Sequence, residues 1–227
     1  MRRRPAILLL VSSLFLMGSL AWGQGSYKAV TGGAPNVSGI PASVQQVLEA
    51  NSVQFENGQG TALCQIWWRK GIPTTKSSSS ADVLYGGLGM GEFLGVVHFP
   101  KATTDYRGQS IKPGDYTLRY ALIPQDGNHM GVSSYRDFLL LIPVADDANP
   151  SQLMTFDQVV KASRLTAGTG HPAVMMLDPA GQGASKFPAA FQDDQGNWAL
   201  GVKLDVSQSG QPQQMPFALV LVGQYQG

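Results

Sequence analysis

The segment of residues 111–142 constrains the fold more than any other part of the chain. It opens with a turn signal, Pro113-Gly114-Asp115, in which proline presets φ and glycine can take a positive φ. The residues that follow alternate in character, and successive side chains of a strand point to opposite faces. One face of this predicted strand is strongly apolar and carries Tyr116, Leu118, Tyr120 and Leu122. Pro124 ends the strand, because proline has no N–H for the hydrogen-bond ladder.

The apolar run 138–142 (FLLLI) predicts a second strand, which stops at Pro143. A short run that is apolar on both faces, with breakers on either side, is typical of a central strand covered on both sides. The run is too short to favour a helix. The polar loop between the two strands contains Asp126 and His129. Arg119 stands on an otherwise apolar strand, and we expect it to pair with Asp137, since buried charges need partners.

The rest of the chain repeats this pattern of short strands between breakers. The whole chain contains 27 glycines and 14 prolines, and 43% of its 227 residues are apolar, which is enough to fill one core. Two short amphipathic helices are predicted, one at residues 40–48 and one that begins at a Thr155/Gln158 capping box. About eight or nine predicted strands favour an all-β fold. We expect an antiparallel β-sandwich, jelly-roll or immunoglobulin-like, with two short helices.

The N-terminus is typical of a secretory signal. Three arginines at positions 2–4 precede a compact apolar stretch, and small residues precede an expected cleavage after Gly23. Residues 1–23 are then a signal peptide, residues 24–39 a flexible segment, and residues 40–227 a single β-sandwich domain. A membrane anchor is the alternative, but the apolar stretch is shorter than the about 20 residues that a membrane span needs. The mature protein is expected in the periplasm or outside the cell.

Charge and cysteine content exclude some classes of protein. Removal of the signal takes three of the 16 basic residues, which leaves 13 against 15 acidic residues and a net charge of −2. This balance, without basic runs, argues against a nucleic-acid partner. The single cysteine, Cys64, rules out an internal disulfide. Cys64 shares a predicted strand face with Ile66 and Trp68, which indicates an inert buried thiol.

The run PGDYTLRYALIPQDGNHMG, which starts at Pro113 and is followed by RDFLLL, carries a resemblance to known proteins. It resembles a family of exported bacterial proteins that has no assigned function. The likeness extends from about Ile40 to Phe138 and includes the CQIWWRK strand. It serves as a family marker and implies no activity, cofactor or catalytic residue.

Two features are candidates for ligand binding. The first is the polar loop of the central strand pair, and loops on a rigid scaffold often carry function. Its candidate residues are Asp126, Asn128, His129 and Met130. The alternative is a wide turn whose Asp and Asn side chains cap their own backbone. The second is Trp67, beside Arg69, which either stacks on a sugar or partner protein or packs against the second sheet.

Histidines raise the alternative of a metal site. A copper or zinc ion would be held by His129 with Asp126, His98, His171 or Met130, since imidazole suits both metals and a thioether favours cuprous ion. No two histidines have the spacing of a metal-binding motif. His98 is expected on the same strand face as Leu94 and Val96. The alternative to a metal site is that His98 and His171 are half-buried side chains that form hydrogen bonds with backbone groups.

The sequence therefore predicts an exported, non-catalytic protein without a cofactor. It would bind a protein, a glycan or a small ligand through loops at one end. A periplasmic copper or zinc protein centred on His129 is the alternative. A hydrolase is the third hypothesis, although the chain has no G-x-S-x-G elbow and no other nucleophile motif.

Overall fold

The computed structural model describes residues 26–35, 38–76, 80–126, 135–180 and 186–223. The expected signal peptide lies outside these ranges. The strands of the described ranges are β1 (Tyr27–Gly32), β2 (Ser52–Asn57), β3 (Ala62–Trp68), β4 (Ile72–Thr74), β5 (Phe93–Phe99), β6 (Thr103–Thr104), β7 (Ser110–Ile111), β8 (Gly114–Leu122), β9 (Asp137–Pro143), β10 (Val174–Asp178), β11 (Ala189–Gln192), β12 (Trp198–Gln208) and β13 (Gln211–Val222). The helices are α1 (Ala42–Gln45), the 3₁₀ turn η1 (Val144–Asp146) and α2 (Phe156–Ala167). Within the described part of the chain, no helix has the length and apolar character of a membrane span.

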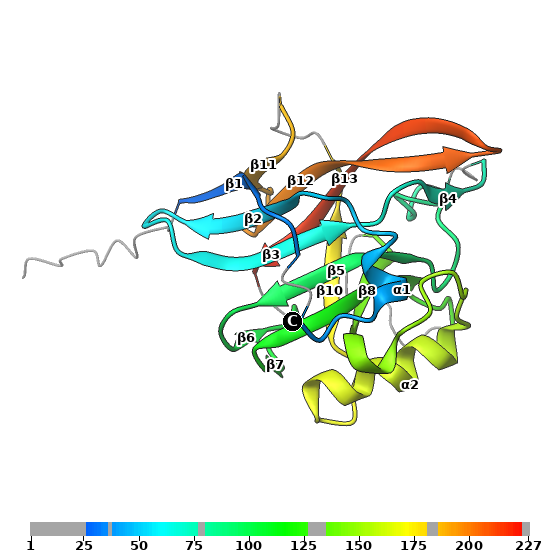
Figure 1. The fold of residues 1–227 in the computed structure, drawn as a ribbon, viewed down its shortest axis with the longest axis horizontal. Helices are drawn as coiled ribbons and strands as arrows, with labels where there is room; N and C mark the ends of the chain where they lie inside the picture. Colours follow the sequence, from blue (N-terminus) through cyan, green and yellow to red (C-terminus); the bar gives the residue numbers. More distant parts are fainter. Residues whose placement is uncertain (1–25, 36–37, 77–79, 127–134, 181–185, 224–227) are drawn as a thin grey trace, which may run out of the picture.

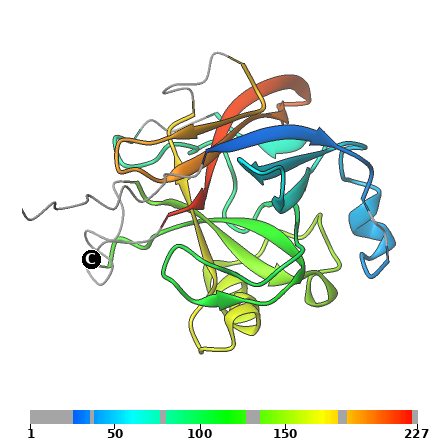
Figure 2. The ribbon, with the colours of Figure 1, turned by 90° about the vertical axis from the view of Figure 1, so that its left-hand side faces the viewer.

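One curled sheet makes up most of the molecule. Its strands follow the order β1-β2-β3-β5-β8-β9-β10-β13-β12-β11, with β4 beside β12, while β6 and β7 form a separate pair. Among the described strands, every ladder is antiparallel except the one between β4 and β12. Strand β10 pairs with β9 through its first residues and with β13 through its last, so it carries the sheet from one layer into the other. Figures 1 and 2 show β12 and β13 crossing over the layer that contains β5 and β8. The all-β, sandwich-like fold with two short helices is confirmed, although both layers belong to one sheet.

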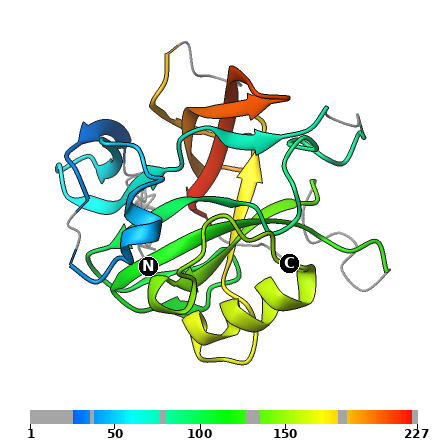
Figure 3. The ribbon, with the colours of Figure 1, turned by 45° about the vertical axis from the view of Figure 1, so that its right-hand side comes forward.

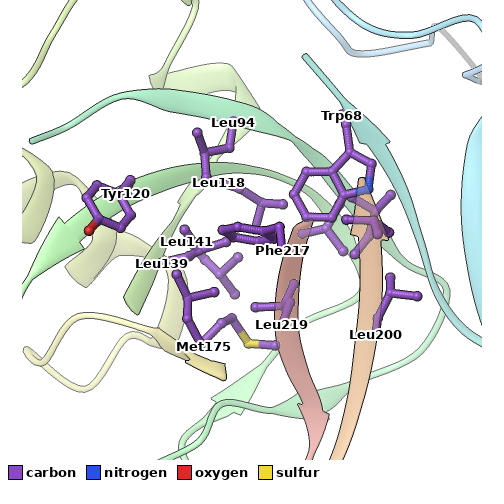
Figure 4. Close-up of a cluster of buried hydrophobic side chains, with 14 of the residues drawn as sticks. Trp68, Leu94, Leu118, Tyr120, Leu139, Leu141, Met175, Leu200, Phe217 and Leu219 are labelled. Carbon is purple, nitrogen blue, oxygen red and sulfur yellow. The ribbon is translucent and has the colours of Figure 1, made fainter. Parts of the chain in front are cut away.

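The main core lies between the two layers (Figure 4). Tyr116, Leu118 and Tyr120 of β8 face Phe217 and Leu219 of β13 across it, as their alternation predicts. The ring of Phe217 is 5.6 Å from that of Trp68 and meets it edge-on. Cys64 belongs to the same core and is 1% exposed. Burial raises the pKa of its thiol to about 12, which agrees with the prediction of an inert side chain.

Strand β9 is the central strand that its apolar run predicts, because it lies between β8 and β10. Leu139 and Leu141 face the main core, whereas Leu140 and Ile142 face a second cluster on the other side of the sheet. Helix α2 covers this second cluster and inserts Val159 into it. Figure 3 shows α2 lying across the outside of this layer. A third cluster sits under α1.

Helix α2 begins at the capping box that the sequence predicts. Thr155 accepts a hydrogen bond from the backbone N–H of Gln158, and the Gln158 side chain accepts one from the backbone N–H of Thr155. The helix ends at Gly168, whose φ of 65° lies in the left-handed region. Both ends of α2 are therefore encoded locally.

We expect Thr155→Ala to lower the free energy of unfolding by about 1 kcal/mol, because the backbone N–H of Gln158 loses the hydroxyl that accepts its hydrogen bond. Urea denaturation of the purified protein measures this loss. Ser151→Ala, at an exposed position before the helix, is the control and should change stability by less than about 0.5 kcal/mol. Equal effects of the two substitutions would contradict a capping role.

The prediction of a flexible segment at residues 24–39 is wrong in part. Residues 27–32 form β1, which pairs with β2 over its whole length. The ring of Tyr27 stacks on that of Phe55 with centroids 5.3 Å apart, and it also contacts Trp198 of β12. The open edge of β2 supplies the pairing, which a local sequence pattern does not reveal.

The face predicted for His98 is also partly wrong. A bulge between Phe93 and Gly95 interrupts the alternation of β5. Leu94 consequently faces the main core, while Phe93 and Val96 face the cluster under α1. His98 shares the face of Val96 but not that of Leu94.

Candidate functional site

Trp67 is not available to stack on a ligand. Its side chain is 3% exposed and packs in the cluster under α1 with Phe93 and Val144. The indole N–H donates to the carbonyl oxygen of Gly33 at 3.1 Å. The hypothesis of an exposed, binding tryptophan is therefore wrong, and the packing alternative holds. Sequence alternation places Trp67 on the face opposite to Cys64 correctly, but α1 covers that face.

Arg69 is likewise occupied by contacts within the protein. Its Nη1 lies 2.6 Å from Oε1 of Glu92 and 3.1 Å from the carbonyl oxygen of Pro150. Burial raises the pKa of Glu92, and the positive charges of Arg69 and Arg119 offset part of that rise. Arg69 therefore acts as a structural contact to the segment that follows β9.

The predicted loop site falls mostly outside the described residues. Asn128, His129 and Met130 lie there, so their role in binding stays a prediction. Asp126 is described and exposed at the edge of this loop. Whether these four side chains lie close together therefore stays a prediction.

Arg119 forms a buried ion pair, but with Asp147 and not with the predicted Asp137. Its Nε and Nη2 donate to the two oxygens of Asp147 at 2.8 and 2.6 Å, and both side chains are at most 1% exposed. The remaining N–H groups reach the carbonyl oxygens of Gly91, Gln152 and Asn149. All five donors of the guanidinium are thus satisfied. The group ties residues 147–152, hereafter the 147–152 segment, to the sheet.

The prediction for Asp137 fails because the two residues occupy opposite faces of their strands. Asp137 lies opposite Leu122 in the register, on the main-core side, whereas Arg119 points to the outer side. Asp137 instead accepts hydrogen bonds from the backbone N–H groups of Leu84 and Tyr85 and, at 2.6 Å, from the hydroxyl of Tyr120. It anchors the loop before β5 to the core.

The histidines occupy unlike surroundings. His98 and Asp115 stand directly opposite each other on β5 and β8, and Nδ1 of His98 lies 2.9 Å from Oδ1 of Asp115. His171 is exposed, and its backbone N–H contacts Thr169. His98 is half-buried, as expected, but among the described residues neither histidine side chain makes the expected hydrogen bond to a backbone group. Within the described ranges, no group of three or more His, Cys, Asp or Glu side chains is arranged to hold a metal ion. Because His129 lies outside those ranges, the copper or zinc site stays a prediction.

A cleft of about 440 Å³ opens beside the His98–Asp115 pair. It lies where the turn before β8, the end of β9 and the last turn of α2 meet. Figure 1 shows β8 and α2 in the lower part of the molecule. We call it the Lys112 cleft, and its lining residues are Ser110, Lys112, Pro113, Gly114, Asp115, Tyr116, Pro143, Leu165, Thr166, Ala167 and Gly168. In the sequence, Pro113-Gly114-Asp115 predicts only a turn. The missing signal was the approach of α2, which lies about 50 residues further along the chain.

Local hydrogen bonds hold the walls of the Lys112 cleft in place. The hydroxyl of Tyr116 donates to the carbonyl oxygen of Lys112 at 2.9 Å, which fixes the turn before β8. The hydroxyl of Thr166 donates to the carbonyl oxygen of Leu141 at 2.8 Å, which fixes the end of α2 against β9. The cleft is therefore formed before any ligand arrives.

A separate acidic group makes stability depend on pH. Burial, followed by the negative charges of Asp193 and Asp194, raises the pKa of Asp178 to about 6. The folded state therefore binds the Asp178 proton more tightly than the unfolded state. Stability from this group is present below the ordinary pKa of an aspartate and is lost as pH rises towards 6.

We expect Asp178→Asn to stabilise the protein by about 1 kcal/mol at pH 7.5, a value reduced for the partial exposure of the side chain. The gain should shrink towards zero at pH 4, where the native carboxyl is protonated. Urea denaturation at the two pH values tests this, with Asp146→Asn at an exposed aspartate as the control. A gain that is the same at both pH values would refute the electrostatic cause.

Comparisons of the chain with protein-family models, with curated proteins and with solved structures found no match. The resemblance to exported bacterial proteins therefore stays a prediction. The chain is therefore an all-β protein of sandwich-like architecture. A cleft lined by both polar and apolar residues lies at one end of β8.

Proposed function

We propose that the protein is an exported binding protein that holds a small ligand in the Lys112 cleft. The observation that carries this proposal is the cleft itself, whose volume of about 440 Å³ is within the usual size of ligand sites. Its lining combines apolar side chains such as Pro143 and Leu165 with the charged groups of Lys112 and Asp115. Ligand sites typically have this mixture, in which apolar area supplies affinity and a few polar groups set orientation.

The site differs in place from the loop that the sequence singles out. Lys112 precedes β8 and Asp126 follows it, and the nine residues of β8 separate the two by roughly 30 Å. One ligand of small size therefore cannot contact both. Binding needs only groups that line the cleft, whereas hydrolysis would need an activated nucleophile or water in addition. This favours binding over the hydrolase hypothesis.

Chemical-shift mapping tests the proposal. The ¹⁵N-labelled protein is titrated separately with leucine, glucose, octanoate and inorganic phosphate. We expect at least one compound to shift the amide signals of residues 112–116 together with those of 165–168. Leu165→Asp should weaken that response at least tenfold, because it places a charge on the apolar wall of the cleft. Leu165 is exposed, so we expect the variant to fold normally. Shifts that avoid both stretches for every compound would refute a ligand site here.

A further inference from the structure

The Lys112 cleft contains two side chains of opposite charge, Lys112 and Asp115, each of which keeps polar atoms that are open to a ligand. Lys112 makes no ion pair within the described residues and is exposed. Asp115 uses Oδ1 for His98, and in the described part of the chain Oδ2 has no hydrogen-bond partner. The Asp115 side chain is 24% exposed. A positive and a negative group are thus both open to a ligand in the same cleft.

The end of α2 adds to the negative side. Leu165–Gly168 line the cleft, and α2 ends at Ala167 with Gly168 as its C-cap. The carbonyl groups of a last helical turn carry partial negative charge and favour cations. Asp115 and the helix end together therefore favour an ammonium group, while Lys112 favours a carboxylate.

The apolar part of the cleft fits a hydrocarbon side chain. It is formed by Pro113, Tyr116, Pro143 and Leu165. Leu165 is 61% exposed and, with Leu153, is one of two large apolar side chains with such exposure in the described residues. A ligand that covers Leu165 removes apolar surface from water, which stabilises the complex.

We propose that the ligand is a small zwitterion with an apolar side chain, namely an apolar α-amino acid. This inference rests on the proposed function of the cleft and names the class of ligand. A simple anion would meet Asp115 and the helix end, and a simple cation would meet Lys112. A neutral sugar would leave both charges without an ionic partner. The carboxylate of an α-amino acid would pair with Lys112, and its ammonium group would pair with Asp115. Its side chain would pack against Pro143 and Leu165.

Calorimetric titration of the purified protein with L-leucine tests the proposal. Three analogues each remove one feature: 4-methylpentanoate lacks the ammonium group, 3-methylbutylamine lacks the carboxylate, and glycine lacks the side chain. We expect each analogue to bind at least tenfold more weakly than leucine, since each loses a charge-assisted contact or the apolar contact. Lys112→Gln and Asp115→Asn should each weaken leucine binding about tenfold or more. Lys70→Gln, which removes an exposed lysine that does not line the cleft, should leave leucine binding unchanged.

The outcomes separate this inference from the proposed function. If an analogue binds as tightly as leucine, or if Lys112→Gln and Asp115→Asn leave leucine binding unchanged, the zwitterion is refuted. If leucine does not bind while octanoate, glucose or phosphate shifts residues 112–116 and 165–168, the ligand class is refuted and the cleft keeps its function. If none of these compounds affects the cleft, both fall. Unchanged amide spectra of the variants away from the cleft show that folding is intact.

Discussion

Arg119→Met is expected to lower the free energy of unfolding by about 3–5 kcal/mol. The substitution leaves Asp147 as a buried carboxylate that keeps Thr117 as a donor but loses both arginine contacts. It also removes the donors to Gly91, Gln152 and Asn149, so the 147–152 segment stays attached to β8 through the Thr117–Asp147 hydrogen bond but loses its contacts with Arg119. Urea denaturation at pH 7 measures the loss.

Two further variants decide whether the unpaired charge is the cause. Arg119→Met combined with Asp147→Leu removes both charges and should recover much of the stability lost by the single variant. Lys28→Met breaks the ion pair between Lys28 and Glu56, in which the lysine side chain is 55% exposed. This control should lower the free energy of unfolding by less than about 1 kcal/mol. If the double variant is less stable than Arg119→Met alone, the buried-charge explanation is wrong.

Gly91→Ala is the second substitution with a large expected effect, a loss of about 3 kcal/mol or more. Gly91 has a φ of 72°, which costs a residue with a Cβ roughly 1–2 kcal/mol. A Cβ there would also stand 2.0 Å from the carbonyl oxygen of Met154, and a backbone atom cannot move aside without displacing the segment before α2. Such overpacking adds about 1–3 kcal/mol.

Gly60→Ala separates the two causes. Gly60 has a φ of 78°, but no atom lies within 4 Å of the position that its Cβ would take. This variant should therefore lose only the conformational part, about 1–2 kcal/mol. Thermal and urea unfolding of both variants give the comparison. Equal losses would show that the close approach to Met154 is relieved without cost.

The strand pattern explains why the fold was largely predictable. The alternation of β3 and β8 predicts which side chains face the main core, and the apolar run of β9 predicts a central strand. These predictions succeed because the twofold repeat of a strand is local. They fail where the repeat is broken, as at the bulge in β5, and where a distant edge recruits a strand, as β2 recruits β1.

The candidate site was much less predictable. The sequence around Trp67 does not show whether its side chain is exposed to solvent or buried under α1. Lys112 and Asp115 appear as ordinary turn residues until Leu165 and Gly168 are brought beside them. No spacing rule connects these two parts of the chain, so the cleft has no local signature.

The sequence by itself determined the inward faces of β3 and β8, the central place of β9, the capped start of α2 and the burial of Cys64, because each depends on neighbours along the chain. Only the tertiary structure decided which acid neutralises Arg119, whether Trp67 meets solvent, and where a cleft remains. Arg119 and Asp147 are 28 residues apart, and their pairing depends on how the 147–152 segment folds back over β8. Charges and concave surfaces are shared between distant segments, and a linear pattern does not record which segments approach each other.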